Sequence, residues 1–102
     1  MNRIDKLREF LAKEPDDSFV KHALALEYQK IGDIPEARRL LEEVLQHDPE
    51  AVGSYYHLGK LLESIGETEK AIDWYQKGMA AAKAAGEKRA YNELQSAYDE
   101  LI

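Results

Sequence analysis

The stretch YYHLGKLLESIGETEKAIDWYQKGM, residues 55–79, contains two apolar segments with helical spacing, one before Gly66 and one after it. In the first segment, Tyr55, Leu58 and Leu62 are three and four positions apart, which places them on one face of an α-helix. Gly66 then interrupts the pattern, as glycine does at helix ends. The residues after Gly66 return to apolar spacings of three and four. The stretch therefore predicts two helices joined by a tight turn.

The same pattern recurs along the chain with a period of 34 residues. When residues 18–51 are aligned with residues 52–85, five positions are identical, and they occur where small or apolar side chains matter for packing. These pairs are Leu24 and Leu58, Ile31 and Ile65, Gly32 and Gly66, Ala37 and Ala71, and Ala51 and Ala85. Residues 1–17 match residues 35–51 in the same register. A fixed period of this length is typical of stacked helical repeats.

The period therefore predicts one domain, 1–102, made of repeating units. Its parts are a half repeat at 1–17, repeats at 18–51 and 52–85, and a last segment at 86–102. We expect helices over residues 2–14, 17–31, 35–47, 49–65, 68–85 and about 87–101. Asp17 and Asp48 are candidate N-caps, Pro35 fits a first helical turn, and Gly86 is a helix stop. Since no stretch alternates with period two, the predicted fold class is all-α.

The residues of the second repeat resemble the tetratricopeptide repeat (TPR) family. Its aromatic–leucine–glycine, turn-glycine and alanine–aromatic positions are matched by Tyr55, Leu58, Gly59, Gly66, Ala71 and Tyr75. Pro15 and Pro49 match the proline that closes a repeat. The first repeat departs from the family at Lys21 and Leu41, where aromatic residues are usual. Lys83 stands where a further proline is expected, so the last helix is interpreted as a cap.

The resemblance implies a superhelix of about five antiparallel helices and a non-catalytic protein–protein interaction module. In this family the first helix of each repeat lines a concave groove that takes a peptide or partner helix. Carried onto this chain, the groove positions are Phe19, His22, Leu26, Lys30, Tyr56, His57, Lys60 and Ser64. Their aromatic and cationic groups suit an acidic or aromatic-bearing peptide. The alternative is that they are ordinary, partly exposed surface residues.

Some family members hold a partner's terminal carboxylate with a lysine–asparagine pair and further basic residues. His22 and Leu26 occupy the positions of that pair, and His57 stands where another asparagine would be. The resemblance therefore implies that this carboxylate clamp is absent.

A second functional hypothesis is a self-associating structural subunit. The helix at 2–14 lacks a partner helix of its own, so it or the last helix could form a homodimer. The last helix carries an apolar stripe and a polar back, which suits a solubilising end of a stack. Inside each repeat, Ala25 and Gly59 are expected to face Ala37 and Ala71, where two helix backbones approach closely.

Composition argues against several other functions. The net charge of −6, with −4 over 1–51 and −2 over 52–102, lacks the basic excess that nucleic acid or an anionic membrane requires. There is no cysteine, no apolar run long enough to span a membrane, and no phosphate-binding loop or nucleophile motif. His22 and His57 have no evident third ligand, so no metal or other cofactor is expected. We predict a non-enzymatic, cytoplasmic protein.

Overall fold

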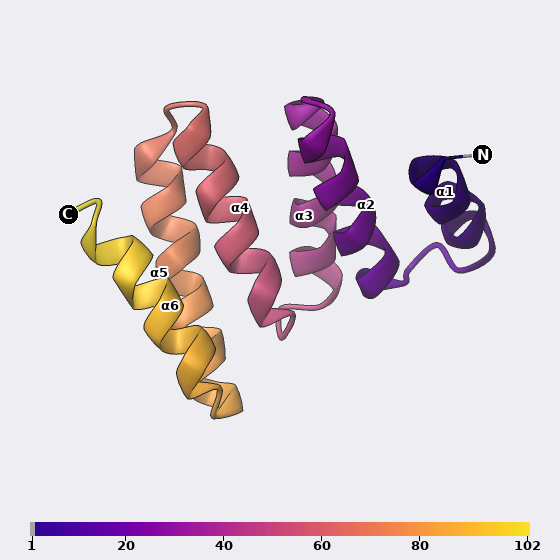
Figure 1. Cartoon of the computed structure of the whole chain (residues 1–102). Coiled ribbons are helices and arrows are strands. Elements are labelled where there is room, and N and C mark those ends of the chain that lie inside the picture. Colours follow the sequence, from indigo (N-terminus) through magenta and orange to yellow (C-terminus); the bar gives the residue numbers. More distant parts are fainter. Residues whose placement is uncertain (1) are drawn as a thin grey trace. The chain divides into compact units, whose positions relative to one another are not determined.

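The computed structural model describes residues 2–102, which form helices joined by short turns (Figure 1). The six helices of this range are α1 (Arg3–Lys13), α2 (Ser18–Lys30), α3 (Ile34–His47), α4 (Val52–Ser64), α5 (Thr68–Ala85) and α6 (Lys88–Asp99). The all-α fold class is confirmed, and the number of helices is close to the five expected. The helices fall into two compact units, Met1–Asp48 and Pro49–Ile102.

Three of the turns are closed by the same backbone arrangement around a glycine. Gly32, Gly66 and Gly86 have φ of 83°, 81° and 73°, a left-handed conformation that strains any residue with a Cβ atom. At the first of them, the Gly32 N–H donates to the Gln29 carbonyl and the Asp33 N–H to the Tyr28 carbonyl, at 3.1 and 2.9 Å. This pair of bonds satisfies carbonyls that the helix end would leave open. The helix stop predicted at Gly86 is confirmed.

The predicted helix starts are confirmed at one aspartate and wrong at another. The Asp17 carboxylate accepts a hydrogen bond of 3.0 Å from the Val20 N–H, as an N-cap does. Asp48 instead ends α3, because its own N–H donates to the Val44 carbonyl at 2.7 Å. The next helix, α4, starts three residues after Pro49, with Ala51 at its N-cap.

The first unit is built around α2 and α3, which run antiparallel with α1 beside α2 (Figure 1). Its core consists of the buried residues Val20, Leu24, Ala25 and Tyr28 of α2 and Ala37, Leu40, Leu41, Val44 and Leu45 of α3. Within the described chain, α1 contributes no buried residue. This helix therefore covers one side of the core while its other face stays exposed.

Lys21 stands where the family resemblance predicts an aromatic residue, and its side chain is buried. Lys21 is only 5% exposed, and its Nζ lies 3.3 Å from Oε1 of Glu43 on α3. A buried ammonium needs such a partner, because an unpaired buried charge is costly. Glu43 also pairs with Arg39, so its second oxygen has a partner in the described structure.

Polar contacts also attach α1 to the rest of the first unit. The Arg8 Nε donates a hydrogen bond of 2.5 Å to the Tyr28 hydroxyl, and the guanidinium lies 5.4 Å from the ring centroid. Arg8 is also 4.0 Å from Glu36. The hydrogen bond from Arg39 to Glu36, with the charges of Arg39 and Arg8, holds the pKa of the Glu36 carboxyl below its ordinary value.

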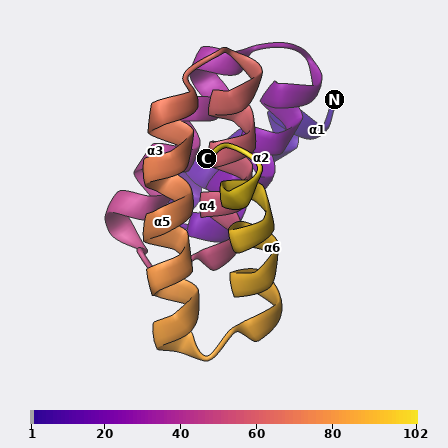
Figure 2. The same ribbon diagram turned by 90° about the vertical axis from the view of Figure 1, so that its left-hand side faces the viewer.

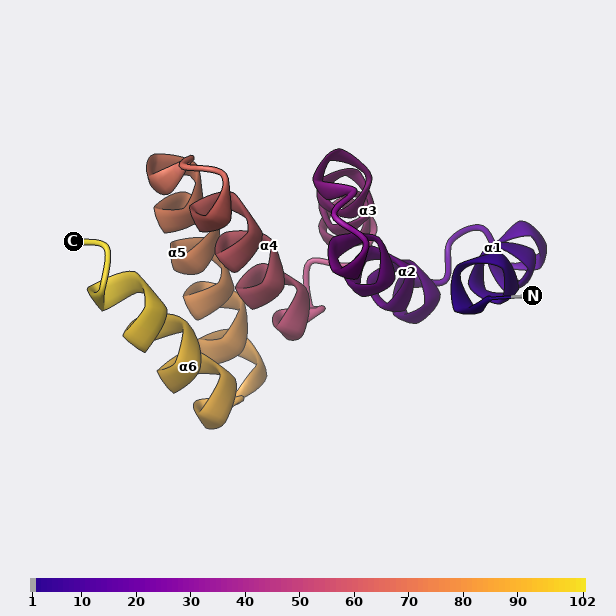
Figure 3. The same cartoon turned by 45° about the horizontal axis from the view of Figure 1, so that its top comes forward.

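The second unit packs α4, α5 and α6 against one another (Figure 3). Its buried side chains include Tyr55, Leu58, Leu61 and Leu62 of α4, Ala71, Tyr75 and Ala82 of α5, and Leu94 and Ala97 of α6. The Tyr55 hydroxyl donates to the Pro49 carbonyl at 2.7 Å, which ties the segment before α4 to the helix itself. Figure 2 shows α5 and α6 running antiparallel from the turn at Gly86.

Two glycines let the helices of the second unit approach closely. A Cβ atom placed on Gly59 would lie 2.2 Å from Cε1 of Tyr75, and one on Gly78 would lie 2.6 Å from the Tyr55 Cβ. The small residue at position 59 thus makes room for the Tyr75 ring. The three atoms nearest to such a Cβ all belong to Tyr75, and the expectation that Gly59 also faces Ala71 stays a prediction.

The helix α6 repeats the pattern of α4 with a longer spacing. From Ser18 to Val52 the step between helix starts is 34, and from Val52 to Lys88 it is 36. In the latter register, Tyr91, Leu94 and Tyr98 take the positions of Tyr55, Leu58 and Leu62. The added residues extend α5 to 18 residues, against 14 for α3. In spacing α6 therefore resembles α4, while its role as a capping helix stays a prediction.

Candidate functional site

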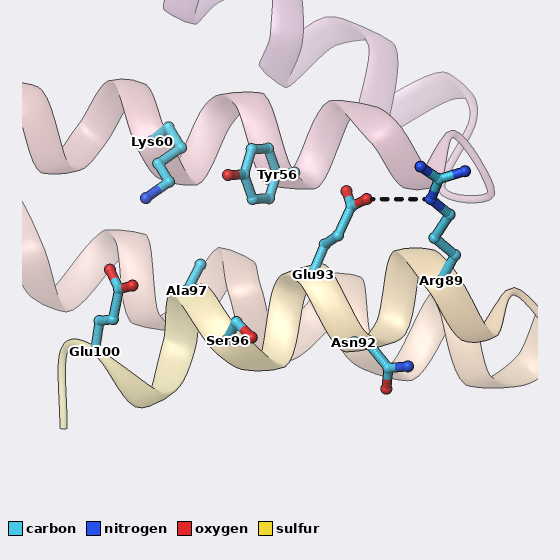
Figure 4. Close-up of a pocket in the computed structure, with 8 residues that line it drawn as sticks. All are labelled: Tyr56, Lys60, Arg89, Asn92, Glu93, Ser96, Ala97 and Glu100. Atoms are coloured by element: carbon cyan, nitrogen blue, oxygen red, sulfur yellow. Dashed lines mark ion pairs between the residues drawn. The ribbon is translucent and has the colours of Figure 1, made fainter.

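An open pocket of about 360 Å³ lies within the second unit, between α4 and α6 (Figure 4). Its lining residues are Tyr56 and Lys60 from α4 and Arg89, Asn92, Glu93, Ser96, Ala97 and Glu100 from α6. The pocket thus lies between two helices that share the same tyrosine–leucine spacing. It is lined by one aromatic ring, charges of both signs, an amide and a hydroxyl.

The α4 side of the pocket is held in place from the core. Tyr75, whose side chain is buried, donates its hydroxyl to Glu63, and Oε2 of Glu63 lies 3.7 Å from the Lys60 Nζ. The same Nζ is 5.8 Å from the centroid of the Tyr56 ring. Burial and the bond to Glu63 raise the pKa of Tyr75, so this phenol stays a hydrogen-bond donor. Glu63 thus links a fixed core donor to the ammonium of Lys60.

The α6 side is more exposed. Arg89 is 95% exposed, and its Nε lies 3.7 Å from Oε1 of Glu93, four residues further along the helix. Figure 4 shows the Glu93 side chain extending from α6 toward α4. Among residues 2–102, Glu100 has no partner in an ion pair. It is the carboxylate of the pocket lining that forms no ion pair in this range.

Two of the four groove positions predicted on α4 line the pocket. Tyr56 and Lys60 do so, whereas His57 and Ser64 do not. His57 packs edge-on against Tyr56 with ring centroids 5.9 Å apart, and desolvation lowers the pKa of its imidazole. The Ser64 hydroxyl donates to the Leu61 carbonyl of its own helix at 2.6 Å.

The four groove positions predicted in the first repeat lie on α2, in the first unit. Phe19 is 83% exposed, His22 and Leu26 are half-buried, and Lys30 is exposed and pairs with Glu27 at 3.2 Å. These residues do not line the pocket between α4 and α6. Their role in binding stays a prediction.

Sequence reasoning did not include the α6 residues in the site. It assigned Arg89, Asn92, Glu93, Ser96 and Glu100 to the polar back of a capping helix. The signal that could have identified them is the tyrosine–leucine pattern of α4, which recurs in α6 after 36 residues instead of 34. In that register, Asn92 and Ser96 correspond to Tyr56 and Lys60.

Residues 2–102 contain neither a metal-binding cluster nor a membrane-spanning helix. This range holds no group of three or more histidine, cysteine, aspartate or glutamate residues placed to bind a metal ion. It also holds no helix long and apolar enough to cross a membrane.

Comparison with known proteins identifies the repeat. The family model described as "Tetratricopeptide repeat" matches residues 22–88, about two thirds of the chain. A TPR repeat-containing protein of Pseudomonas aeruginosa is 29% identical over 91 residues, which cover 89% of this chain and 87% of that protein.

Solved structures agree with this match. The solution structure of a tetratricopeptide repeat domain protein from Salinibacter ruber has 41% identity and a TM-score of 0.82, and covers 85% of this chain and 88% of that one. The protein BPP2914 from Bordetella parapertussis has 26% identity and a TM-score of 0.84, with 99% and 88% covered. The TPR2B domain of yeast Sti1, solved in complex with pHsp70, has a TM-score of 0.89 with 96% and 78% covered. At 16% identity it shows the shared fold alone.

Proposed function

We propose, from the premise that the chain belongs to the tetratricopeptide repeat family, that it binds a peptide or a helix of a partner protein between α4 and α6. TPR proteins are in general protein–protein interaction modules and typically non-catalytic. What the proposal adds for this chain is the location of the binding site. We further propose that residues 1–102 act as one domain in the cytoplasm, with neither nucleic acid nor membrane as the ligand.

The observation that carries the proposal is the pocket between α4 and α6. It is open and wide enough for side chains of an extended segment, and it combines an aromatic face with hydrogen-bonding groups. Lys60 pairs with Glu63, which accepts a hydrogen bond from the buried Tyr75, and the Tyr56 ring lies 6.4 Å from the Tyr75 ring. Both side chains therefore need less ordering when a ligand binds. Preorganised side chains of this kind favour recognition.

The test is selection of a phage-displayed random-peptide library on the wild-type protein. The matched variants are Ser96→Trp, which fills the pocket, and Gln95→Trp, which adds the same bulk at the neighbouring exposed position outside it. We expect selected peptides to bind Ser96→Trp at least about tenfold more weakly than wild type, since a blocked pocket removes the central contacts. Binding to Gln95→Trp is expected to change little.

Circular dichroism establishes that both variants are folded before the binding comparison. If peptides bind Ser96→Trp and wild type equally well, the pocket is not the binding site. If the library yields no peptide that depends on the pocket, the proposed function is wrong.

A second candidate function is self-association through α1. Phe10 is 55% exposed, and it lines, with Leu7, Arg3 and Lys6, a pocket of about 320 Å³ on this helix. An exposed aromatic side chain next to a second apolar residue is a common feature of interfaces. The occupant we consider is a second copy of the chain, whose own Phe10 and Leu7 could cover this apolar surface in a symmetric dimer.

Light scattering at increasing protein concentration tests this candidate. Phe10→Ser should reduce any dimer, whereas Phe19→Ser removes a still more exposed phenylalanine on α2 and should not. A wild-type protein that stays monomeric over the whole concentration range would eliminate this function.

A further inference from the structure

We infer that the pocket between α4 and α6 selects a cationic side chain, lysine or arginine, of the bound segment. This inference rests on the proposed function and adds the chemistry of its ligand. It differs from what the sequence suggested, because tyrosine, histidine and lysine on α4 pointed to an acidic or aromatic-bearing peptide.

The first argument is that the cation on α4 is already neutralised. The Lys60 ammonium lies 3.7 Å from Glu63, whose other contact is the hydroxyl of the buried Tyr75. An incoming carboxylate would compete with Glu63, which is fixed in place and costs nothing further to order. The charge that Lys60 offers to an acidic ligand is therefore small.

The second argument is the charge balance over the whole pocket. Lys60 and Arg89 are paired with Glu63 and Glu93, at 3.7 Å in each case. Glu100, at the C-terminal end of α6, lines the same pocket without an ion-pair partner in the described residues. The pocket and its immediate partners thus carry one carboxylate in excess.

The third argument is that the second unit as a whole is acidic. Residues 49–102 contain six basic and nine acidic side chains, a net charge of −3. Such a charge distribution attracts cationic ligands and repels anionic ones during the encounter.

The neutral residues that line the pocket can also bind a cationic side chain. The Asn92 amide and the Ser96 hydroxyl each offer an acceptor to an N–H donor.

The decisive variant is Glu100→Lys, with Asp73→Lys as its matched control. Both replace an exposed acidic residue of the second unit by lysine and change the net charge equally, but Asp73 lies on α5 and does not line the pocket. A lysine at position 100 also suits the C-terminal end of α6, where a positive charge complements the helix dipole. Loss of the fold is therefore not the expected effect of this variant.

The experiment extends the library selection and then measures affinities. Peptides whose binding depends on the pocket, as shown with Ser96→Trp, are sequenced, synthesised with a fluorescent label and titrated by anisotropy at low and high salt. We expect the pool to be enriched in lysine and arginine. Glu100→Lys should weaken binding roughly three- to tenfold at low salt, with a smaller effect at high salt because ions screen the interaction. Asp73→Lys should change it far less.

The outcomes separate the two proposals. A pocket-dependent pool without basic enrichment, or equal binding by Glu100→Lys and Asp73→Lys, overturns the inference and leaves the proposed function standing. The absence of any pocket-dependent peptide overturns the proposed function and the inference together.

Discussion

Replacing Gly59 by alanine should destabilise the protein, although alanine is the better helix former. In the structure a Cβ atom at this position would lie 2.2, 2.6 and 2.7 Å from Cε1, Cζ and Cδ1 of Tyr75. The Tyr75 ring is fully buried and its hydroxyl is bonded to Glu63, so the ring cannot move away without losing that bond. The new methyl group therefore forces the two helices or the ring to shift.

The magnitude follows from two opposing terms. Overpacking of this kind costs typically about 1–3 kcal/mol, and a rigid aromatic neighbour places the cost near the upper end. Replacement of a helical glycine by alanine returns up to about 1 kcal/mol. The net loss in the free energy of unfolding is about 2 kcal/mol, which for a chain of this size lowers the midpoint of thermal unfolding by about 8–16 °C.

Urea unfolding followed by tryptophan fluorescence is a suitable assay, since Trp74 is the chain's one tryptophan and lies on α5 against Tyr55. Gly53→Ala is the matched control in the same helix, because a Cβ there meets no atom of the described structure within 4 Å. It should be neutral or slightly stabilising.

A double-mutant cycle with Tyr75→Leu isolates the steric term. Removing the ring is itself destabilising, but it should make the further change Gly59→Ala much less harmful. If Gly59→Ala is as stable as Gly53→Ala, or equally destabilising with and without the Tyr75 ring, the close packing of α4 and α5 is not the reason for this glycine.

Three further outcomes are expected. Tyr55→Phe loses the hydrogen bond to the Pro49 carbonyl and should cost about 1 kcal/mol in a urea titration, with little change in helical circular dichroism. Since burial lowers the pKa of His57 in the folded state, its contribution to stability is present above the unfolded pKa near 6.5 and is lost as pH falls toward the folded pKa. His57→Gln should therefore flatten the decline of the thermal midpoint between about pH 7 and pH 5. Lys21→Met should change the free energy of unfolding by less than about 1 kcal/mol, because it removes a buried charge while Glu43 remains partly solvated; a loss of several kcal/mol would contradict this.

Much of the fold follows from local sequence features. The glycines at 32, 66 and 86 mark helix ends because only a residue without a Cβ atom adopts the left-handed conformation easily. The apolar spacing around Tyr55 and Leu58 identifies helices for a similar reason, since it reflects a geometry of 3.6 residues per turn. Such features act over a few residues and are visible without tertiary structure.

Helix starts were harder to predict where neighbouring residues fit both the end of one helix and the start of the next. Asp48 and Pro49 both favour a helix beginning, yet Asp48 closes α3 and α4 begins at Val52. A proline disfavours the helical conformation of the residue before it, here Asp48, and the Tyr55 hydroxyl donates to the Pro49 carbonyl, which ties the segment before α4 to that helix. Propensities at the junction do not contain this contact.

The candidate site shows the same division between local pattern and packing. Tyr56 and Lys60 could be selected from sequence because they face away from the apolar stripe of their helix. Glu93 and Glu100 were not selected, since α6 departs from the 34-residue period and its polar face is typical of an end cap. Sequence alone established the helices, their repeat and one side of the pocket. The packing of α6 beside α4, and the hydrogen bond from the buried Tyr75 to the Glu63 that pairs with Lys60, join residues on different helices, so only the tertiary structure reveals the pocket and what holds its α4 side.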